Sequence, residues 1–245
     1  MAEFVETRQE GAFFYITLNR PKKRNAISAE MYTHLTKVLA QANADEKTTF
    51  TVLTGKGEYF SSGSDFDFSK VKSQFQDPSA LQEPPYYRFI SALFEHRKIL
   101  VALVNGPAIG IGVTLMSLFD LIVAADDAYF EPRRSLFPQL MGRIPASRML
   151  LFSDKLTAAE AQQFGLITHV LPRAKYEEGC RAILKRVGGL APGALLECKA
   201  RIQNESIKKE LRHAHEEERA ILAKRWSSPE LFERMSRVFD KKAKI

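Results

Sequence analysis

Two short stretches of this sequence could do chemistry with backbone groups rather than with side chains. Gly110–Gly112 (Gly-Ile-Gly) follows the apolar run Val101–Val104 and an Asn-Gly-Pro break, which together predict a strand, a turn and a buried helix. Ser62–Ser64 (Ser-Gly-Ser) follows the β-like run Thr49–Leu53. Glycine lets a ligand approach the backbone closely, because it has no Cβ. Each stretch therefore offers a backbone donor to a ligand at the end of a strand.

These donors are the N–H groups of Ser64 and Ile111. The first N–H groups of a helix have no acceptor within it, and the helix dipole favours negative charge there. If the two donors converge, they form an oxyanion hole, in which each donor stabilises a transition state by about 3 kcal/mol. Such a pocket suits enolate or tetrahedral chemistry. The alternative is that the glycines only relieve crowding between strand and helix.

Other chemistries find less support in the pattern. His213 and His215 are two residues apart on a predicted helix, so they point to different faces, and we expect both to be solvated. No spacing of Cys and His resembles a zinc site, and no metal site is predicted. A serine hydrolase would need a Gly-x-Ser-x-Gly elbow, which Ser61–Ser64 does not provide. The glycines of Gly106–Gly112 match neither a dinucleotide fingerprint nor a P-loop.

Length and composition indicate one globular core. The chain has 245 residues, of which 45% are hydrophobic and 27% charged, and no apolar run approaches a membrane span. Two cysteines, Cys180 and Cys198, suggest a reducing compartment without a disulfide framework. The net charge of +7 favours anionic partners. Of the basic clusters, Lys22–Arg24 is best placed to bind one, because it follows a strand end and a proline turn.

The predicted elements alternate between strand and helix first and end in helices. We expect strands at Phe13–Leu18, Phe50–Leu53, Val101–Val104, Leu121–Ala124 and Ala128–Phe130, with a short return within Gly165–Pro172. Helices are expected after the N-caps Ser28 and Thr157 and at Tyr86–His96, Tyr176–Val187, Ala194–Asn204, Ile207–Arg225 and Pro229–Phe239, with a loop over Asp65–Gln82. This order predicts an α/β core over residues 1–190 and a helical C-terminal region over residues 191–245.

Several blocks of the sequence resemble the signatures of the crotonase, or enoyl-CoA hydratase/isomerase, superfamily. They keep the superfamily's order over nearly the whole chain. The blocks are Leu18–Ala26, Phe60–Asp65, Asn105–Gly112, Leu156–Ala161 and Gly165–Ile167. Three stretches look most like the peroxisomal 3-enoyl to 2-enoyl-CoA isomerases, namely Ser61–Asp65, Gly110–Leu115 and Lys224–Trp226.

The resemblance implies a crotonase-like spiral of ββα units with a helical trimerisation region at the C-terminus. It also implies a coenzyme A thioester as substrate, no separate cofactor, and self-association as a homotrimer or hexamer. The thioester oxygen would lie between the N–H groups of Ser64 and Ile111. The residues expected to bind the substrate are Lys22, Lys23, Arg24, Ala26, Ser62, Gly63, Asp65, Phe66 and Gly110.

The sequence departs from the superfamily at its catalytic carboxylates. Hydratases use two glutamates, and the aligned positions here are Thr114 and Arg134, so hydratase activity is not expected. Isomerisation needs one carboxylate, to move a proton from C2 to C4 of the acyl chain. No acidic residue occurs from Pro132 to Ser153, which makes Glu131 the nearest candidate base.

Two interpretations therefore remain open. The chain is either an isomerase of unsaturated fatty acyl-CoA in β-oxidation, acting through an enolate, or a non-catalytic protein of the same fold that binds acyl-CoA or RNA. The C-terminal tripeptide Ala243–Ile245 resembles the Ser-Lys-Leu peroxisomal signal. It predicts a peroxisome-type organelle, with the cytosol or mitochondrial matrix as the alternatives.

Overall fold

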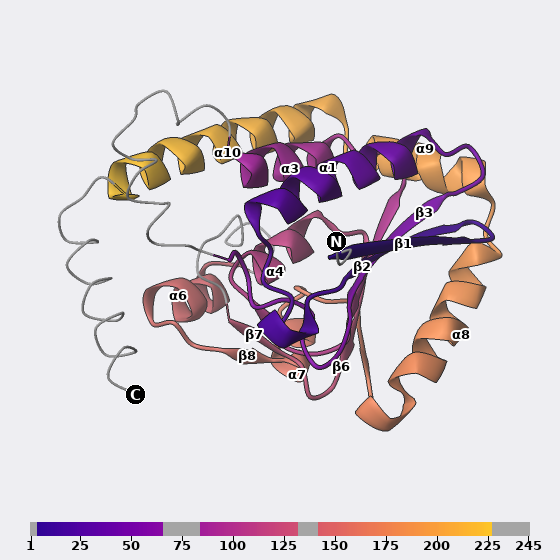
Figure 1. Cartoon of the computed structure of the whole chain (residues 1–245), viewed down its shortest axis with the longest axis horizontal. Helices are drawn as coiled ribbons and strands as arrows, with labels where there is room; N and C mark the ends of the chain where they lie inside the picture. The colour runs from indigo at the N-terminus through magenta and orange to yellow at the C-terminus, as the bar shows by residue number, and fades with distance from the viewer. Residues whose placement is uncertain (1–3, 66–83, 132–141, 227–245) are drawn as a thin grey trace.

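A computed structural model describes residues 4–65, 84–131 and 142–226, and its centre is a six-stranded sheet (Figure 1). The strand order is β1-β2-β3-β4-β6-β9, with β1 antiparallel to β2 and every other neighbouring pair parallel. The strands are β1 (Val5–Glu10), β2 (Phe13–Leu18), β3 (Phe50–Gly55), β4 (Ile99–Val104), β6 (Leu121–Ala125) and β9 (His169–Leu171). The predicted strands are confirmed. β1 was not predicted, because only Val5 of this edge strand is buried and the rest reads as a polar segment.

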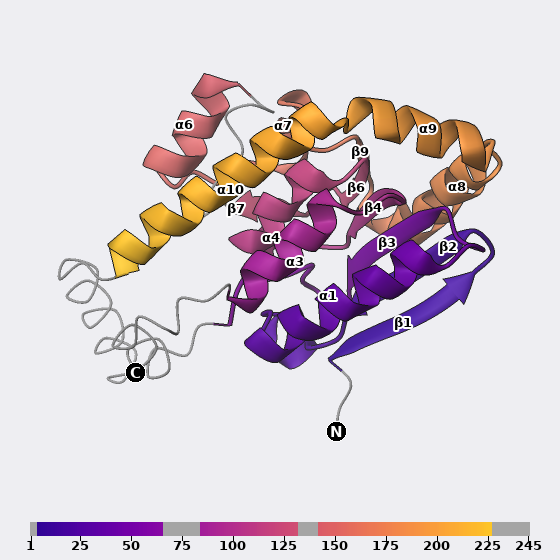
Figure 2. The same ribbon diagram turned by 90° about the horizontal axis from the view of Figure 1, so that it is seen from above.

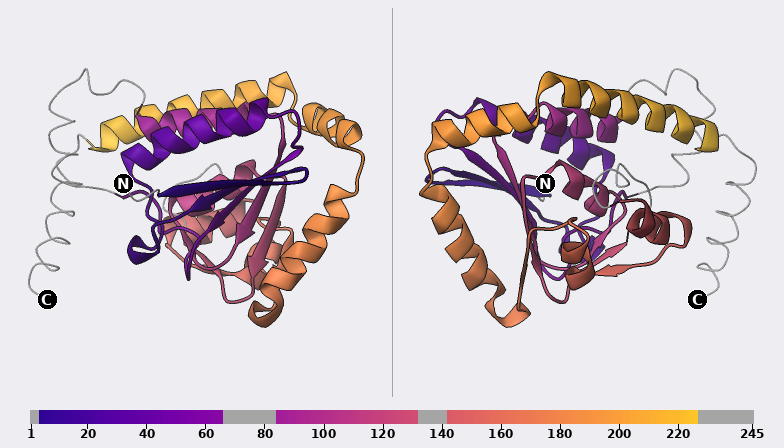
Figure 3. Two further views of the ribbon diagram at one scale, coloured as in Figure 1. Left: turned by 45° about the vertical axis from the view of Figure 1, so that its right-hand side comes forward. Right: turned by 180° about the vertical axis from the view of Figure 1, so that it is seen from behind.

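Helices cover both faces of this sheet. On one face lie α1 (Ala29–Ala44) and α3 (Pro85–Phe94), whose apolar side chains share a core with Leu18 and Leu100. On the other face lies α8 (Tyr176–Gly188), which packs on Val52 and Val101. Figure 3 shows α1 and α8 on opposite sides of the sheet. Buried on both faces, the parallel strands read as continuous apolar runs, which is why they could be predicted.

Of the C-terminal helices, α9 (Pro192–Ile202) contacts β4, and α10 (Glu205–Trp226) packs against α3. α10 runs alongside α3, with α1 on the far side of α3 (Figure 2). The predicted helix over 229–239 and nearly all of the predicted loop over 65–82 lie outside the described residues. None of the helices within those residues is long and apolar enough to cross a membrane.

A second, three-stranded sheet has the order β5-β7-β8 and carries the glycine-rich turn. Its elements are β5 (Ala108–Ile109), β7 (Tyr129–Glu131) and β8 (Leu156–Thr157), with α4 (Ile111–Thr114), α6 (Arg143–Leu151) and α7 (Ala158–Gln163) nearby. The buried helix predicted after Gly112 is shorter than expected. It consists of one turn of α-helix followed by the 3-10 helix η3 (Leu115–Leu118), because the chain becomes extended at Phe119 to enter β6.

Both predicted N-caps are confirmed. The Ser28 hydroxyl accepts from the N–H of Met31, and Thr157 forms a capping box with Glu160. The expectation that both His213 and His215 are solvated was wrong for one of them. His213 is exposed, but His215 is buried and its ring stacks on Tyr87. Burial lowers the pKa of His215.

Candidate functional site

The loops that follow β3 and β4 meet at the two predicted glycine stretches. Ser61 bridges Ala108, and the N–H of Ile109 donates to the Ser61 carbonyl at 2.8 Å. A Cβ added to Gly63 would lie 3.0 Å from the carbonyl oxygen of Ile109 and 3.7 Å from Cα of Gly110. The first of these distances is tighter than an ordinary Cβ contact, so a side chain at Gly63 would press on the Ile109 backbone. The structure thus brings Gly63 and Gly110 together, and the two donors belong to the residues that follow them.

The backbone around Ser64 is held from one side. Ile27 donates to the Gly63 carbonyl and accepts from the N–H of Asp65, both at 2.8 Å, in a parallel bridge opposite Ser64. In a parallel bridge of this kind, Ile27 forms its hydrogen bonds with the two residues that flank Ser64, and not with Ser64 itself. The N–H and C=O of Ser64 therefore point away from Ile27. That N–H donates to none of the described residues. It is therefore available to a ligand.

Ile111 presents its N–H in a similar way. It is the first residue of α4, after Gly110 with φ 59° and ψ −121°, a conformation that favours glycine. The Gly110 N–H donates to the carbonyl of Glu131, and the N–H groups of Val113 and Thr114 turn back to Gly110. Within the described part of the chain, the Ile111 N–H has no acceptor. Close packing of Gly112 on Ser61 fixes the start of this helix, because a Cβ there would lie 3.2 Å from Ser61.

The predicted coenzyme A segment lies against the Ser62–Ser64 loop. Lys22 and Lys23 are exposed in the 3-10 helix η1 (Pro21–Lys23), and Arg24 is exposed next to it. The N–H of Ser62 donates to the Arg24 carbonyl at 2.8 Å, and the Ser62 hydroxyl contacts the Lys23 carbonyl at 3.4 Å. Ala26 is half-buried at the end of this turn. Three exposed cationic residues thus belong to the segment whose backbone contacts Ser62.

Asn25 anchors this segment, and sequence analysis did not single it out. It is fully buried with φ 53°, a left-handed conformation that asparagine tolerates better than most residues. Its side chain accepts from the Arg20 N–H at 2.9 Å and donates to the carbonyls of Lys56 and Tyr59. Arg20 also forms an ion pair with the exposed Asp65 at 2.9 Å. The Asp65 carboxylate is therefore engaged within the protein, and Phe66 lies outside the described residues.

The residues predicted to bear on proton transfer include Thr114, Arg134 and Glu131. The hydroxyl of buried Thr114 contacts the Gly110 carbonyl of its own helix at 3.3 Å, and Arg134 lies outside the described residues. Glu131 lies next to Gly110, and its carboxylate forms an ion pair with Lys155 at 3.2 Å. Its side chain shares one face of β7 with Tyr129, opposite the buried Phe130, and is 23% exposed.

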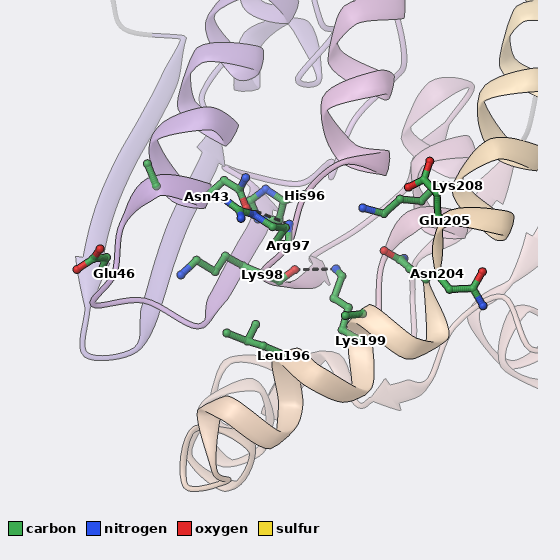
Figure 4. Close-up of a pocket in the computed structure, with 13 residues that line it drawn as sticks. Asn43, Glu46, His96, Arg97, Lys98, Leu196, Lys199, Asn204, Glu205 and Lys208 are labelled. Carbon is green, nitrogen blue, oxygen red and sulfur yellow. Dashed lines mark hydrogen bonds between the residues drawn. The ribbon is translucent and has the colours of Figure 1, made fainter.

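A cavity of about 600 Å³ lies at the amino ends of β3 and β4, whereas the two donors follow the carboxyl ends of these strands. Figure 4 shows residues that line this cavity. Its walls include His96, Arg97 and Lys98 before β4, and Lys199 of α9. The buried Lys199 ammonium donates to the Lys98 carbonyl and to Asp120, both at 2.6 Å. Burial lowers the pKa of His96 to about 3, so its imidazole is neutral. No group of three His, Cys, Asp or Glu among the described residues could hold a metal ion.

Comparison with known proteins decides the family. The model of the family described as Enoyl-CoA hydratase/isomerase matches residues 8–242. The chain belongs to the enoyl-CoA hydratase/isomerase family. It is 36% identical over 253 residues to enoyl-CoA delta isomerase 2 of Rattus norvegicus, covering 96% of this chain and 63% of the rat protein. It is also 36% identical over 235 residues to enoyl-CoA delta isomerase 3, peroxisomal, of Mus musculus, covering 91% of this chain and 71% of the mouse protein.

The solved structures agree with this assignment to the enoyl-CoA hydratase/isomerase family. An enoyl-CoA hydratase/isomerase from Pseudoalteromonas atlantica superposes with a TM-score of 0.86 at 28% identity, covering 98% of each chain. The predicted crotonase fold is therefore confirmed. The chain spans about two thirds of the length of the rat relative. Activity, substrate and assembly are accordingly matters of proposal.

Proposed function

We propose that this chain is an acyl-CoA isomerase that converts 3-enoyl-CoA into trans-2-enoyl-CoA in fatty-acid oxidation. The observation that carries the proposal is the contact between Gly63 and Gly110, each followed by a residue whose N–H lacks an acceptor among the described residues. Buried or half-buried donors of this kind are costly unless a ligand accepts from them. The relatives named enoyl-CoA delta isomerase support the choice of reaction.

In this mechanism the thioester oxygen accepts from the N–H groups of Ser64 and Ile111. A base removes a proton from C2, and the electron pair of that C–H bond moves toward the carbonyl to give an enolate. When the carbonyl re-forms, the electron pair between C1 and C2 of the enolate moves to form the C2–C3 double bond. The π electrons of the former C3–C4 double bond then bind a proton at C4. The oxygen carries the developing charge in between, and each donor stabilises it by about 3 kcal/mol.

A single carboxylate can carry the proton from C2 to C4, and Glu131 is the first candidate. Its backbone adjoins Gly110, and its carboxylate forms an ion pair with Lys155 at 3.2 Å. Hydration would need a second carboxylate to activate water. The Thr114 hydroxyl, which contacts the Gly110 carbonyl, is not suited to that role. This difference supports isomerisation over hydration.

Substrate binding would use the cationic segment beside the Ser62–Ser64 loop. Lys22, Lys23 and Arg24 are exposed and carry no carboxylate partner among the described residues, so they can meet the phosphates of coenzyme A. No separate cofactor is required. We further propose assembly as a homotrimer or hexamer through the C-terminal region of residues 191–245. A peroxisomal location would match the printed name of the mouse relative.

The test removes one oxyanion donor without altering the helix. Proline is tolerated at the first position of a helix, where Ile111 lies, and it lacks the N–H. We expect Ile111→Pro to lower kcat for 3-hexenoyl-CoA and 3-dodecenoyl-CoA by about 10²- to 10³-fold. The assay measures the ultraviolet absorbance of the conjugated product. The matched control Ile111→Ala keeps the N–H and should stay within about threefold of wild type.

Two outcomes contradict this proposal. Equal loss of kcat in Ile111→Pro and Ile111→Ala would mean that the side chain, not the N–H, matters. A folded wild-type chain that binds acyl-CoA without turnover would instead favour a non-catalytic binder, as the substitution at Thr114 allows. If turnover is present, Glu131→Gln then tests the base.

A further inference from the structure

One buried tyrosine contacts the residue that carries the first oxyanion donor. The hydroxyl of Tyr32 lies 2.7 Å from Oγ of Ser64, a short hydrogen-bond distance. Tyr32 is in the first turns of α1 and is 4% exposed. Its ring packs against Tyr86 and Phe89 of α3, with ring centroids 6.5 Å and 5.8 Å away. The phenol is thus fixed by two helices and points its hydroxyl at the site.

The Ser64 N–H is restrained from one side by Ile27. It belongs to the same planar peptide as the Gly63 carbonyl, which accepts from the Ile27 N–H at 2.8 Å. Gly63 has no Cβ, so its backbone angles are less restricted than those of other residues. The hydrogen bond between the Ser64 and Tyr32 hydroxyls holds this residue from a second direction. Together the two contacts limit rotation of the peptide that presents the donor.

We propose that Tyr32 is a positioning residue of the oxyanion site, acting through the Ser64 side chain. This inference rests on the proposed function. Tyr32 does not touch the reacting atoms; it keeps the Ser64 N–H aimed at the position of the thioester oxygen. An oxyanion donor contributes fully only when it is held in place before the charge develops. Without the phenolic hydroxyl, the donor remains, but only the hydrogen bonds to Ile27 hold its peptide.

The test compares two buried tyrosines that each lose one hydroxyl. Tyr32→Phe should lower kcat on the order of tenfold and change KM less than about twofold, since misplacement acts on the transition state. The matched control is Tyr176→Phe, on the opposite face of the sheet, where the hydroxyl donates to the Val123 carbonyl at 3.2 Å. Thermal melts should show a similar loss of stability in both variants. Only Tyr32→Phe should lose turnover.

A double-mutant cycle tests the route through Ser64. If Tyr32 acts through that side chain, Ser64→Ala alone should lower kcat on the order of tenfold, and adding Tyr32→Phe should lower it little further. Ser64→Thr keeps a hydroxyl and should retain more activity than Ser64→Ala. Independent, multiplicative effects of the two changes would overturn the proposal, as would equal kcat values for Tyr32→Phe and Tyr176→Phe.

A spectroscopic readout separates this inference from the proposed reaction. Acetoacetyl-CoA ionises to an enolate that absorbs in the ultraviolet, and an oxyanion site should favour that form on binding. We expect a larger enolate absorbance with the wild type and Tyr176→Phe than with Tyr32→Phe. If 3-enoyl-CoA is not turned over but this difference is seen, the proposed reaction fails and the role of Tyr32 stands. Equal absorbance in all three proteins would overturn that role.

Discussion

The two ends of the parallel strands differ in whether their hydrogen-bond donors have acceptors within the protein. At the carboxyl ends of β3 and β4, the N–H groups of Ser64 and Ile111 donate to none of the described residues. At the amino ends lies the cavity of about 600 Å³, and there the donors are engaged. The Lys98 ammonium donates to the carbonyls of Asp45 and Thr48, and the Lys199 ammonium to Lys98 and Asp120.

This difference teaches that the size of a cavity does not identify the site. A donor that already has its acceptor gains little from a ligand, whereas an unsatisfied donor gains a hydrogen bond. The glycine-lined region is therefore a better candidate than the cavity of about 600 Å³. Its place also agrees with the general rule that open α/β sheets bind ligands beyond the carboxyl ends of their strands.

The largest effect should follow from separating the two glycines. In Gly63→Ala, a Cβ would lie 3.0 Å from the Ile109 carbonyl oxygen in a residue with φ 95°, so the loop must move away from Gly110. We expect kcat for 3-hexenoyl-CoA to fall about 10²-fold or more. Gly165→Ala is the control, because Gly165 also has positive φ, 76°, but nothing lies within 4 Å. It should cost about 1 kcal/mol of stability in urea and leave kcat unchanged.

Equal losses of kcat in these two variants would break the comparison, because backbone strain alone would then explain them. A loss confined to Gly63→Ala would tie activity to the contact between the two loops.

A smaller effect, on stability rather than turnover, is expected at the amino ends of the strands. Burial lowers the pKa of His96 to about 3, whereas an unfolded chain titrates its histidines near 6.5. The unfolded state therefore binds more protons between these values, and the stability present above pH 6.5 is lost as the pH falls. From pH 7.5 to pH 5, His96 should account for a loss of about 2 kcal/mol in the free energy of unfolding.

The variant His96→Gln isolates this contribution. Glutamine does not titrate, and its amide extends about as far as the Nε2 atom of His96, which contacts the Thr51 hydroxyl at 2.8 Å. His215 titrates in both proteins, so the difference between their pH profiles reports on His96. Urea denaturation at pH 7.5 and pH 5 measures it. A variant as sensitive to pH as the wild type would contradict the prediction.

Local patterns could be predicted from the sequence, and distant contacts could not. Ser28 and Thr157 begin their helices because capping depends on residues within one turn. The two glycine stretches were recognisable by their position after apolar runs. The burial of His215 depends instead on Tyr87 and Phe94, more than 100 residues earlier in the chain, with ring centroids 4.1 Å and 5.4 Å away. No helical periodicity reports such a partner.

In the candidate site, too, local features could be predicted from the sequence and distant contacts could not. Glycine placement indicated which N–H groups are free, and the family resemblance indicated their role. The contact between Gly63 and Gly110, and the hydrogen bond between the hydroxyls of Tyr32 and Ser64, arise only when α1 and two separate loops come together. Tyr32 lies four residues after the Ser28 cap, on the buried side of α1, where a tyrosine reads as core. Its hydroxyl partner is 32 residues away in the sequence.

The smallest effect concerns exposed charge and tests which end of the sheet meets coenzyme A. Lys22 and Lys23 are exposed beside the oxyanion loop, and Arg97 is exposed at the cavity on the other side. Exposed ionic contacts are weak and screened by salt, so Lys22→Gln with Lys23→Gln should raise KM about two- to fivefold at low ionic strength and little in 0.5 M salt. Arg97→Gln removes one positive charge at the cavity and should leave KM unchanged, whereas each single change, Lys22→Gln or Lys23→Gln, should raise it. The reverse result would place the coenzyme in the cavity, because a cation acts on a bound phosphate only within about a Debye length.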